Sequence, residues 1–160
     1  MRHDGLRTAR WIALLLPAAL LAGAWGSQLF GLVPCEMCHW QRWPHYAALP
    51  FAALAFASMP RPARLLLVLI AAALIAVSGA IGVLHAGVEY HWWPGFTPCT
   101  APVGHGDAME MLTQALRRPF VRCDVPQWTL FGISLAGFNA ILSLGGALTI
   151  LVLSLRRPRG

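Results

Sequence analysis

Four long apolar runs constrain the fold of this chain more than any other feature. They cover residues 11–33, 43–59, 65–84 and 129–155. A helix needs roughly 20 apolar residues to cross a bilayer, so three runs are long enough and 43–59 is marginal. The first run also resembles a signal peptide with a cleavage site at 22–24, but its apolar character continues to Val33, so we expect a retained span. With 58% hydrophobic and 11% charged residues, the 160-residue chain is predicted to be one integral membrane domain.

The arginines set the predicted topology. A count of four spans places the arginines of residues 1–10, 60–64 and 156–160 on one side of the membrane, whereas an odd count would divide them. By the positive-inside rule this side is cytoplasmic, and segments 34–42 and 85–128 face outward. We therefore expect an all-α membrane protein, a four-transmembrane-helix bundle with both termini cytoplasmic. The net charge of +6 is dispersed between apolar runs, which excludes a basic face that tracks nucleic acid.

The outward segment 85–128 contains one predicted helix. Residues 107–110 fit a capping pattern, and Met109, Leu112 and Leu116 follow at helical spacing. We expect a short amphipathic helix that lies flat on the bilayer, or alternatively packs on the mouth of the bundle. The residues before it, 89–106, are rich in proline and glycine, which indicates irregular structure and a docking surface for a partner.

Small and polar residues inside the runs predict how the helices pack. The small residues are Ser78 and Gly82 in the third run, and Gly132, Ala136 and Ala140 in the fourth. Small residues at a spacing of four allow membrane helices to approach closely. Asn139 lies among them and is expected to make an interhelical hydrogen bond.

All four cysteines lie in the segments predicted to face outward. Cys35 and Cys38 are three positions apart, whereas Cys99 and Cys123 are 24 positions apart. Cysteines of exported proteins usually form structural disulfides, whose stabilising effect grows with the length of the closed loop. Because the Cys35–Cys38 ring is too small to restrain much chain, we predict that this pair is redox-active. For Cys99 and Cys123, a structural disulfide and a redox relay both remain open.

Metal and haem are the competing explanations for these cysteines. A structural zinc site would need two close pairs, which Cys99 and Cys123 do not supply, so we expect no metal. Residues 35–39, Cys-Glu-Met-Cys-His, satisfy the C-x-x-C-H pattern of covalent haem attachment. The short segment 34–42 leaves little protein to enclose a macrocycle, and haem would not explain the second pair. A membrane-anchored c-type haem electron carrier is the alternative function.

Arg42 and His85 are the candidate contacts for an electron acceptor. Arg42 follows Cys38 by four positions, so both lie on one face of a helix that begins near Trp40. Its guanidinium would favour the Cys38 thiolate and polarise a carbonyl oxygen, or instead bind lipid phosphates. His85 would donate a hydrogen bond to a bound ring or cap its helix. The remaining histidines receive no role and are expected to be interfacial or solvated: His39, His45, His91 and His105.

These motifs together resemble the disulfide bond formation protein B (DsbB) family of bacterial thiol oxidases. The matching residues are Pro34-Cys35, Cys38 and Gln41-Arg42, then Thr97-Pro98-Cys99, then Arg122-Cys123-Asp124, Trp128 and Phe131-Gly132-Ile133-Ser134. The resemblance covers nearly the whole chain. Two cysteine pairs in this topology are a specific indication of the family, whereas any one of the motifs alone would not be. His39 and the composition of residues 89–106 depart from the family's pattern.

The resemblance implies a multi-pass protein of the bacterial inner membrane. Such a protein reoxidises a periplasmic thioredoxin-like (DsbA-like) dithiol oxidase and passes the electrons to a quinone. Carried over by position, Cys99 would form the mixed disulfide with the partner, and Cys123 would resolve it. Cys123 would then exchange with Cys35, which leaves Cys38 as the thiolate that faces the quinone.

The same resemblance implies the cofactor. Because a DsbA-like partner is itself strongly oxidising, thiol exchange alone would hardly drive its reoxidation. Arg42 matches the family's quinone-binding arginine, and His85 matches a histidine of the family only after a small gap. We therefore expect ubiquinone or menaquinone as the cofactor, bound by these two residues.

Overall fold

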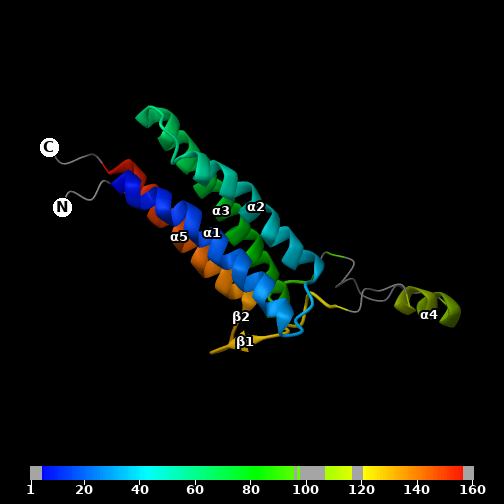
Figure 1. Ribbon diagram of the computed structural model, residues 1–160. Coiled ribbons are helices and arrows are strands. Elements are labelled where there is room, and N and C mark those ends of the chain that lie inside the picture. Colours follow the sequence, from blue (N-terminus) through cyan, green and yellow to red (C-terminus); the bar gives the residue numbers. More distant parts are fainter. Residues whose placement is uncertain (1–4, 96, 98–106, 117–120, 157–160) are drawn as a thin grey trace.

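Long helices that lie side by side make up most of the chain (Figure 1). The computed structural model describes residues 5–95, 97, 107–116 and 121–156. Its elements are α1 (Gly5–Leu29), α2 (Glu36–Leu54), α3 (Arg61–Glu89), α4 (Ala108–Leu116), β1 (Thr129–Leu130), β2 (Ile133–Ser134) and α5 (Leu135–Leu155). Within these residues, three helices are long and apolar enough to cross a membrane: α1, α3 and α5. The chain is thus an all-α helical membrane protein, and α2 does not meet the same criteria.

Contacts between helix ends show how the bundle is threaded. Arg10 near the start of α1 donates a hydrogen bond from Nη1 to the carbonyl oxygen of Ala55, 3.2 Å away, just beyond the end of α2. Gly5 packs against the backbone of Leu153 at the end of α5. The start of α1 therefore lies beside the ends of α2 and α5, and Cys35 lies at the opposite end of α2.

Helix α2 begins earlier than the sequence predicted. The Sγ atom of Cys35 accepts a hydrogen bond from the backbone N–H of Cys38 at 3.2 Å and so caps the first turn. Glu36 in that turn interacts favourably with the positive end of the helix dipole. Consequently the segment 34–42, which was expected as an outward loop, is largely helical.

Residues 129–134 form a β-hairpin instead of the first turns of the last helix. Its two central residues, Phe131 and Gly132, have φ angles of 52° and 78°, which a two-residue hairpin turn requires. The Tyr90 hydroxyl donates to the carbonyl oxygen of Gly132 at 2.9 Å and accepts from the N–H of Ser134 at 2.8 Å. The prediction that Gly132 packs between helices is therefore wrong, because this residue forms the turn.

The other small residues bring α3 and α5 into close contact, as predicted. A Cβ atom on Gly82 would lie 3.0 Å from the backbone nitrogen of Ala140 and 3.1 Å from the carbonyl oxygen of Ala136. Ala136 and Ala140 are both buried. The core between the long helices is rich in alanine, including Ala9, Ala13, Ala48, Ala52, Ala71 and Ala72. Close packing of small side chains thus holds the bundle together.

Substitution of Gly82 by leucine is expected to destabilise the bundle by about 1–3 kcal/mol, the usual cost of overpacking. The added side chain meets the backbone of α5, which cannot move aside without separating the helices. Gly145 in α5 is the matched control, because a Cβ there meets nothing within 4 Å. Both changes improve helix propensity alike. Equal thermal unfolding midpoints of G82L and G145L in detergent would contradict this close packing.

The predicted helix of the second outward segment is present as α4. Asp107 caps it by accepting a hydrogen bond from the N–H of Glu110 at 2.8 Å. Met109, Leu112 and Leu116 are each more than half exposed, and α4 lies apart from the bundle in Figure 1. Its apolar face is therefore not packed on the bundle mouth, and contact with the bilayer surface stays a prediction.

Candidate thiol redox site

The first turn of α2 presents two sulfur atoms to the end of α3. The Sγ atoms of Cys35 and Cys38 lie 2.8 Å apart. Cys35 is buried and Cys38 is half-buried. The Sγ atom of Cys35 also lies 3.5 Å from Nε2 of His85. The cap residue and the third residue of one helix thus form a close pair of thiols beside an imidazole.

A third cysteine joins this pair from the segment that precedes the hairpin. Cys123 is fully buried in a cluster with Cys35, Met37 and Val88. Its side chain lies close enough to that of Cys35 to raise the pKa of the Cys35 thiol. Cys35 is therefore packed with both Cys38 and Cys123. Cys99, the predicted mate of Cys123, lies outside the described residues.

Polar contacts hold the two cysteine-bearing segments together. The side-chain amide of Gln127 donates to the carbonyl oxygen of Val33 at 2.6 Å and accepts from its N–H at 3.0 Å. On either side of Cys123, Arg122 Nε donates to Asp124 Oδ1 at 2.9 Å. This guanidinium lowers the pKa of Asp124. No sequence pattern indicates the Gln127 contact, because it joins residues far apart in the chain.

The thiols of the α2 turn differ in their acidity. This turn precedes the predicted span 43–59. The hydrogen bond from the Cys35 thiol lowers the pKa of Cys38, whereas hydrogen bonding with Cys123 and Cys38, together with burial, raises the pKa of Cys35. The helix dipole also favours an anion at this position. Cys38 is therefore the more acidic of the two thiols. The contact that lowers its pKa most is the hydrogen bond from Cys35, not Arg42 as the sequence led us to expect.

In the fully reduced protein, iodoacetamide at pH 7 is expected to alkylate Cys38 at least about tenfold faster than Cys35. Only the thiolate reacts, and the lowered pKa of Cys38 gives it more thiolate at this pH than an ordinary thiol of pKa about 8.5. Mass spectrometry of the modified peptides over a pH series measures both rates. Exposure alone would give the two rates the same pH profile, so parallel profiles would contradict the assignment of the thiolate.

Arg42 is buried beside Cys38 between α1, α2 and α5. Its Nη2 atom donates to the carbonyl oxygen of Ala24 at 3.1 Å, and its guanidinium carbon lies 5.9 Å from the Trp25 ring centroid. Arg42 and Cys38 both line a cavity of about 220 Å³. They also line a smaller cavity of about 50 Å³. The guanidinium is thus held where it can meet a molecule that reaches Cys38.

His85 lines the smaller cavity and contacts the thiols more directly than Arg42 does. Besides its contact with Cys35, its ring lies near the backbone of Cys123. Its Nδ1 atom lies 2.7 Å from the amide nitrogen of Gln41. Glu89 is also near, with Oε1 3.7 Å from Nε2. His85 therefore links both cysteine-bearing segments to α3.

Sequence reasoning missed His45, which we expected to be interfacial or solvated. This expectation is wrong, because His45 is only 3% exposed and its Nε2 lies 3.0 Å from Oδ1 of Asn139. The signal was its position seven residues after Cys38, which places both on one helix face. The interhelical hydrogen bond predicted for Asn139 is confirmed, since its Nδ2 donates to Gln41 Oε1 at 2.9 Å.

Comparison with known families agrees with this grouping of thiols. A family model described as disulfide bond formation protein DsbB matches residues 6–153. The chain belongs to the DsbB family. No curated protein and no solved structure matches it. As a member of the DsbB family, it is a multi-pass membrane thiol oxidoreductase with a role in disulfide bond formation.

The geometry also bears on metal and haem as alternatives for this DsbB family member. The ligand atoms of Cys35, Cys38 and His85 lie within 4.8 Å of one another. Within the part of the chain that is described, this cluster offers three donors, one fewer than a structural zinc site uses. Covalent haem would need each sulfur to reach a different vinyl group, but the sulfurs face each other and Cys35 is buried. The arrangement favours a redox dithiol.

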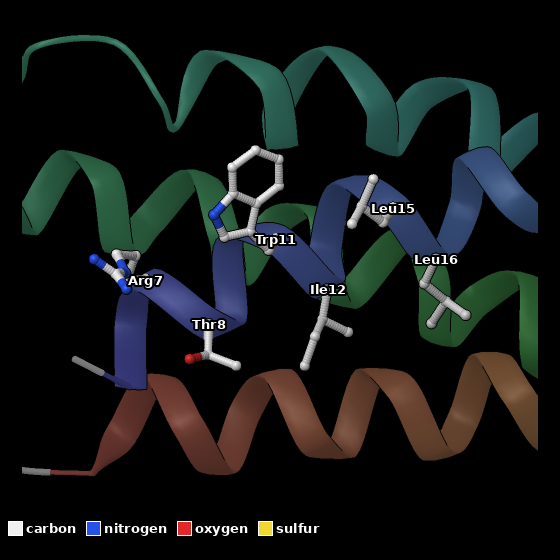
Figure 2. A pocket seen from close by; sticks show the side chains of 6 residues that line it. All are labelled: Arg7, Thr8, Trp11, Ile12, Leu15 and Leu16. Carbon is white, nitrogen blue, oxygen red and sulfur yellow. The ribbon is translucent and has the colours of Figure 1, made fainter. Parts of the chain in front are cut away.

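A third cavity of this DsbB family member lies at the far end of the bundle. Its volume is about 560 Å³. Figure 2 shows the side chains of α1 that line it, which are Arg7, Thr8, Trp11, Ile12, Leu15 and Leu16. Trp11 and Leu15 are about half exposed. None of the lining residues is a cysteine or histidine, so we assign no redox chemistry to this cavity. Its mostly apolar lining suits lipid chains.

Proposed function

We propose that the chain is a quinone-reducing thiol oxidase that reoxidises a periplasmic DsbA-like dithiol oxidase in the bacterial inner membrane. The observation that carries the proposal is the buried contact of Cys123 with Cys35, which leads to Cys38 and the cavity beside Arg42. In this proposal α2 crosses the membrane from residue 43 onwards, which gives four spans in all, and both termini are cytoplasmic. The burial of Ala48 and Ala52 of α2 in the core shared with α1, α3 and α5 supports four spans.

The proposed relay begins with attack by a partner thiolate on Cys99 of a Cys99–Cys123 disulfide. Cys123 leaves as a thiolate, and the second partner thiol attacks the mixed disulfide, which releases the oxidised partner. Cys123 then attacks Cys35 of a Cys35–Cys38 disulfide and expels Cys38. This direction is favoured because Cys38 has the lowered pKa and is the better leaving group. Attack by Cys99 on the resulting bond restores Cys99–Cys123 and frees Cys35.

The cycle closes when the reduced Cys35–Cys38 pair forms its disulfide again. Its two electrons and two protons leave on the quinone, which supplies two-electron acceptance when bound. Arg42 would hold a ring oxygen of the quinone, Cys38 would donate the electrons to it, and His85 would orient Cys35. At about 220 Å³ the cavity is smaller than sites of about 300–1,000 Å³ that enclose whole drug-sized ligands, so it suits one ring whose apolar tail stays in lipid. Ubiquinone and menaquinone both consist of a quinone ring with an apolar tail.

Anaerobic mixing tests the function directly. Purified protein is combined with a reduced thioredoxin-like dithiol oxidase and ubiquinone-1, and quinol formation is followed optically. We expect one quinol for each partner disulfide formed, because the balanced reaction converts a dithiol and a quinone into a disulfide and a quinol. Partner disulfide without quinol, or no catalysed reaction at all, would refute the proposal.

The alternative function is a membrane-anchored c-type haem electron carrier. The C-x-x-C-H pattern at residues 35–39 is the observation that supports it. A visible spectrum separates the two functions, because covalent haem would give a Soret band that survives denaturation. We expect no such band.

A further inference from the structure

A cluster of polar side chains lies between α2, α3 and α5, near the thiols. Its members are the buried Gln41, His45, Ser78 and Ser143 and the half-buried Asn139. Nε2 of His45 lies 3.0 Å from Asn139 Oδ1 and 2.9 Å from Ser78 Oγ. Because buried polar groups are costly without partners, such a cluster is expected to satisfy each of its donors and acceptors.

Two backbone carbonyl groups fix the orientation of both amides in this cluster. Gln41 Nε2 donates to the carbonyl oxygen of Met37 at 3.2 Å, and Asn139 Nδ2 donates to that of Ser78 at 3.1 Å. A carbonyl oxygen only accepts, so the nitrogen of each amide must face it. Oδ1 of Asn139 therefore faces His45, and as an acceptor it requires a proton on Nε2 of His45.

The tautomer of His45 follows from these contacts. The Ser78 hydroxyl uses its own hydrogen to donate to the carbonyl oxygen of Gln41 at 2.8 Å, so it too accepts from Nε2 of His45. In the neutral ring a proton on Nε2 leaves Nδ1 as an acceptor. Nδ1 is buried and has no hydrogen-bond partner within the described part of the chain. His45 thus carries one unused acceptor.

This unused acceptor belongs to a residue that lines the cavity of about 220 Å³. Cys38, Arg42 and His45 line it from successive turns of α2, and Asn139 lines it from α5. Nε2 is occupied by the polar cluster, and Nδ1 is covered by its neighbours, so a molecule in the cavity reaches Nδ1 only when the side chains around it shift. Its partner must be a hydrogen-bond donor.

We propose that His45 Nδ1 accepts a hydrogen bond from a hydroxyl group of the quinol, so that the cavity binds the reduced ring more tightly than the oxidised ring. This rests on the proposed function. A quinone carbonyl oxygen has no hydrogen to donate, whereas each quinol hydroxyl has one. Tighter binding of the quinol makes the bound couple a stronger oxidant, and a tenfold preference corresponds to about 30 mV for two electrons.

The test measures binding instead of turnover. In a Cys38→Ser background, which prevents electron transfer, anaerobic titrations with ubiquinol-1 and ubiquinone-1 are followed by tryptophan fluorescence. Trp25 packs beside Arg42 at the cavity and is the expected reporter, so Trp25→Phe gives the background signal. We expect quinol to bind about tenfold more tightly than quinone, which is near the upper end of the contribution of one net hydrogen bond.

Two variants separate a ligand contact from a structural role. Glutamine in H45Q can place its amide nitrogen near the position of Nε2, which keeps the bond to Asn139 but removes Nδ1. We expect H45Q to lose the preference, with quinol affinity about tenfold weaker and quinone affinity within twofold of the parent. H45N, whose amide lies nearer the position of Nδ1, is expected to keep part of the preference.

The other outcomes would overturn either this proposal or the proposed function. Equal weakening of both ligands in H45Q would assign His45 a structural role only and overturn the proposal. Equal affinities for quinol and quinone in the parent would overturn it as well, while the saturable binding of quinone would leave the proposed function standing. If neither ligand binds the parent saturably, the proposed function itself fails.

Discussion

Replacement of Cys38 by serine is expected to reduce quinone-dependent oxidation of a partner dithiol to the rate seen without protein. Without Cys38 the pair at the start of α2 cannot form its disulfide, so no electrons can pass to quinone. The Cys99–Cys123 disulfide would still oxidise one partner molecule per protein. The measurement is therefore a time course of partner oxidation, with a single stoichiometric burst and no turnover after it.

The neighbouring histidine provides the matched control. His39 is exposed, follows Cys38 directly, and has no role in the proposed relay. His39→Ala is expected to keep normal turnover, whereas a c-type haem carrier would lose its axial ligand. If the protein only scaffolds its partners through structural disulfides, C38S would leave oxidation of the partner dithiol unchanged. This result would refute the proposed enzymatic function.

The marginal second apolar run shows how far the sequence could predict the fold. Its length was marginal because Gln41 and Arg42 precede it and His45 interrupts it. In the structure these residues face the cavity and the polar cluster, while Ala48 and Ala52 are buried in the core. The polar residues that weaken the hydropathy signal are therefore the residues that form the candidate site. The spacing of these residues along α2 places them on one side of the helix. To predict this from the sequence, one must already know where the helix begins.

Long-range contacts account for most of what the sequence did not reveal. The topology predicted that the cysteines lie at one end of the bundle, but not that Cys123 is buried against Cys35. That burial depends on contacts such as Gln127 with Val33, which join residues far apart in the sequence. Local patterns succeeded where the cause was local, as in the cap of α4 by Asp107. They failed for Gly132, because the hairpin depends on Tyr90.

Arg42→Ala is expected to raise the quinone KM by about 10- to 100-fold and to leave the stoichiometric burst of partner oxidation unchanged. A charged hydrogen bond contributes about 1.5–3 kcal/mol, which corresponds to this range. Arg42 lines the cavity but does not lie between Cys123 and Cys35, so exchange between the cysteine pairs does not require it. Steady-state assays at varied ubiquinone-1 give the KM, and a quenched-flow burst gives the exchange rate. An unchanged quinone KM would remove Arg42 from the acceptor site.

Reactivity of Cys38 separates two possible roles of Arg42. The largest cause of the lowered pKa of Cys38 is its hydrogen bond with Cys35, so Arg42→Ala should leave the pH profile of Cys38 alkylation unchanged. If alkylation at pH 7 falls together with quinone affinity, the guanidinium acts on the thiolate instead of the acceptor. Arg42→Lys is the matched control, since it keeps the charge but loses the planar fork of donors. Partial recovery of the KM by lysine would show that charge contributes, and the remaining defect would measure the contribution of the guanidinium geometry.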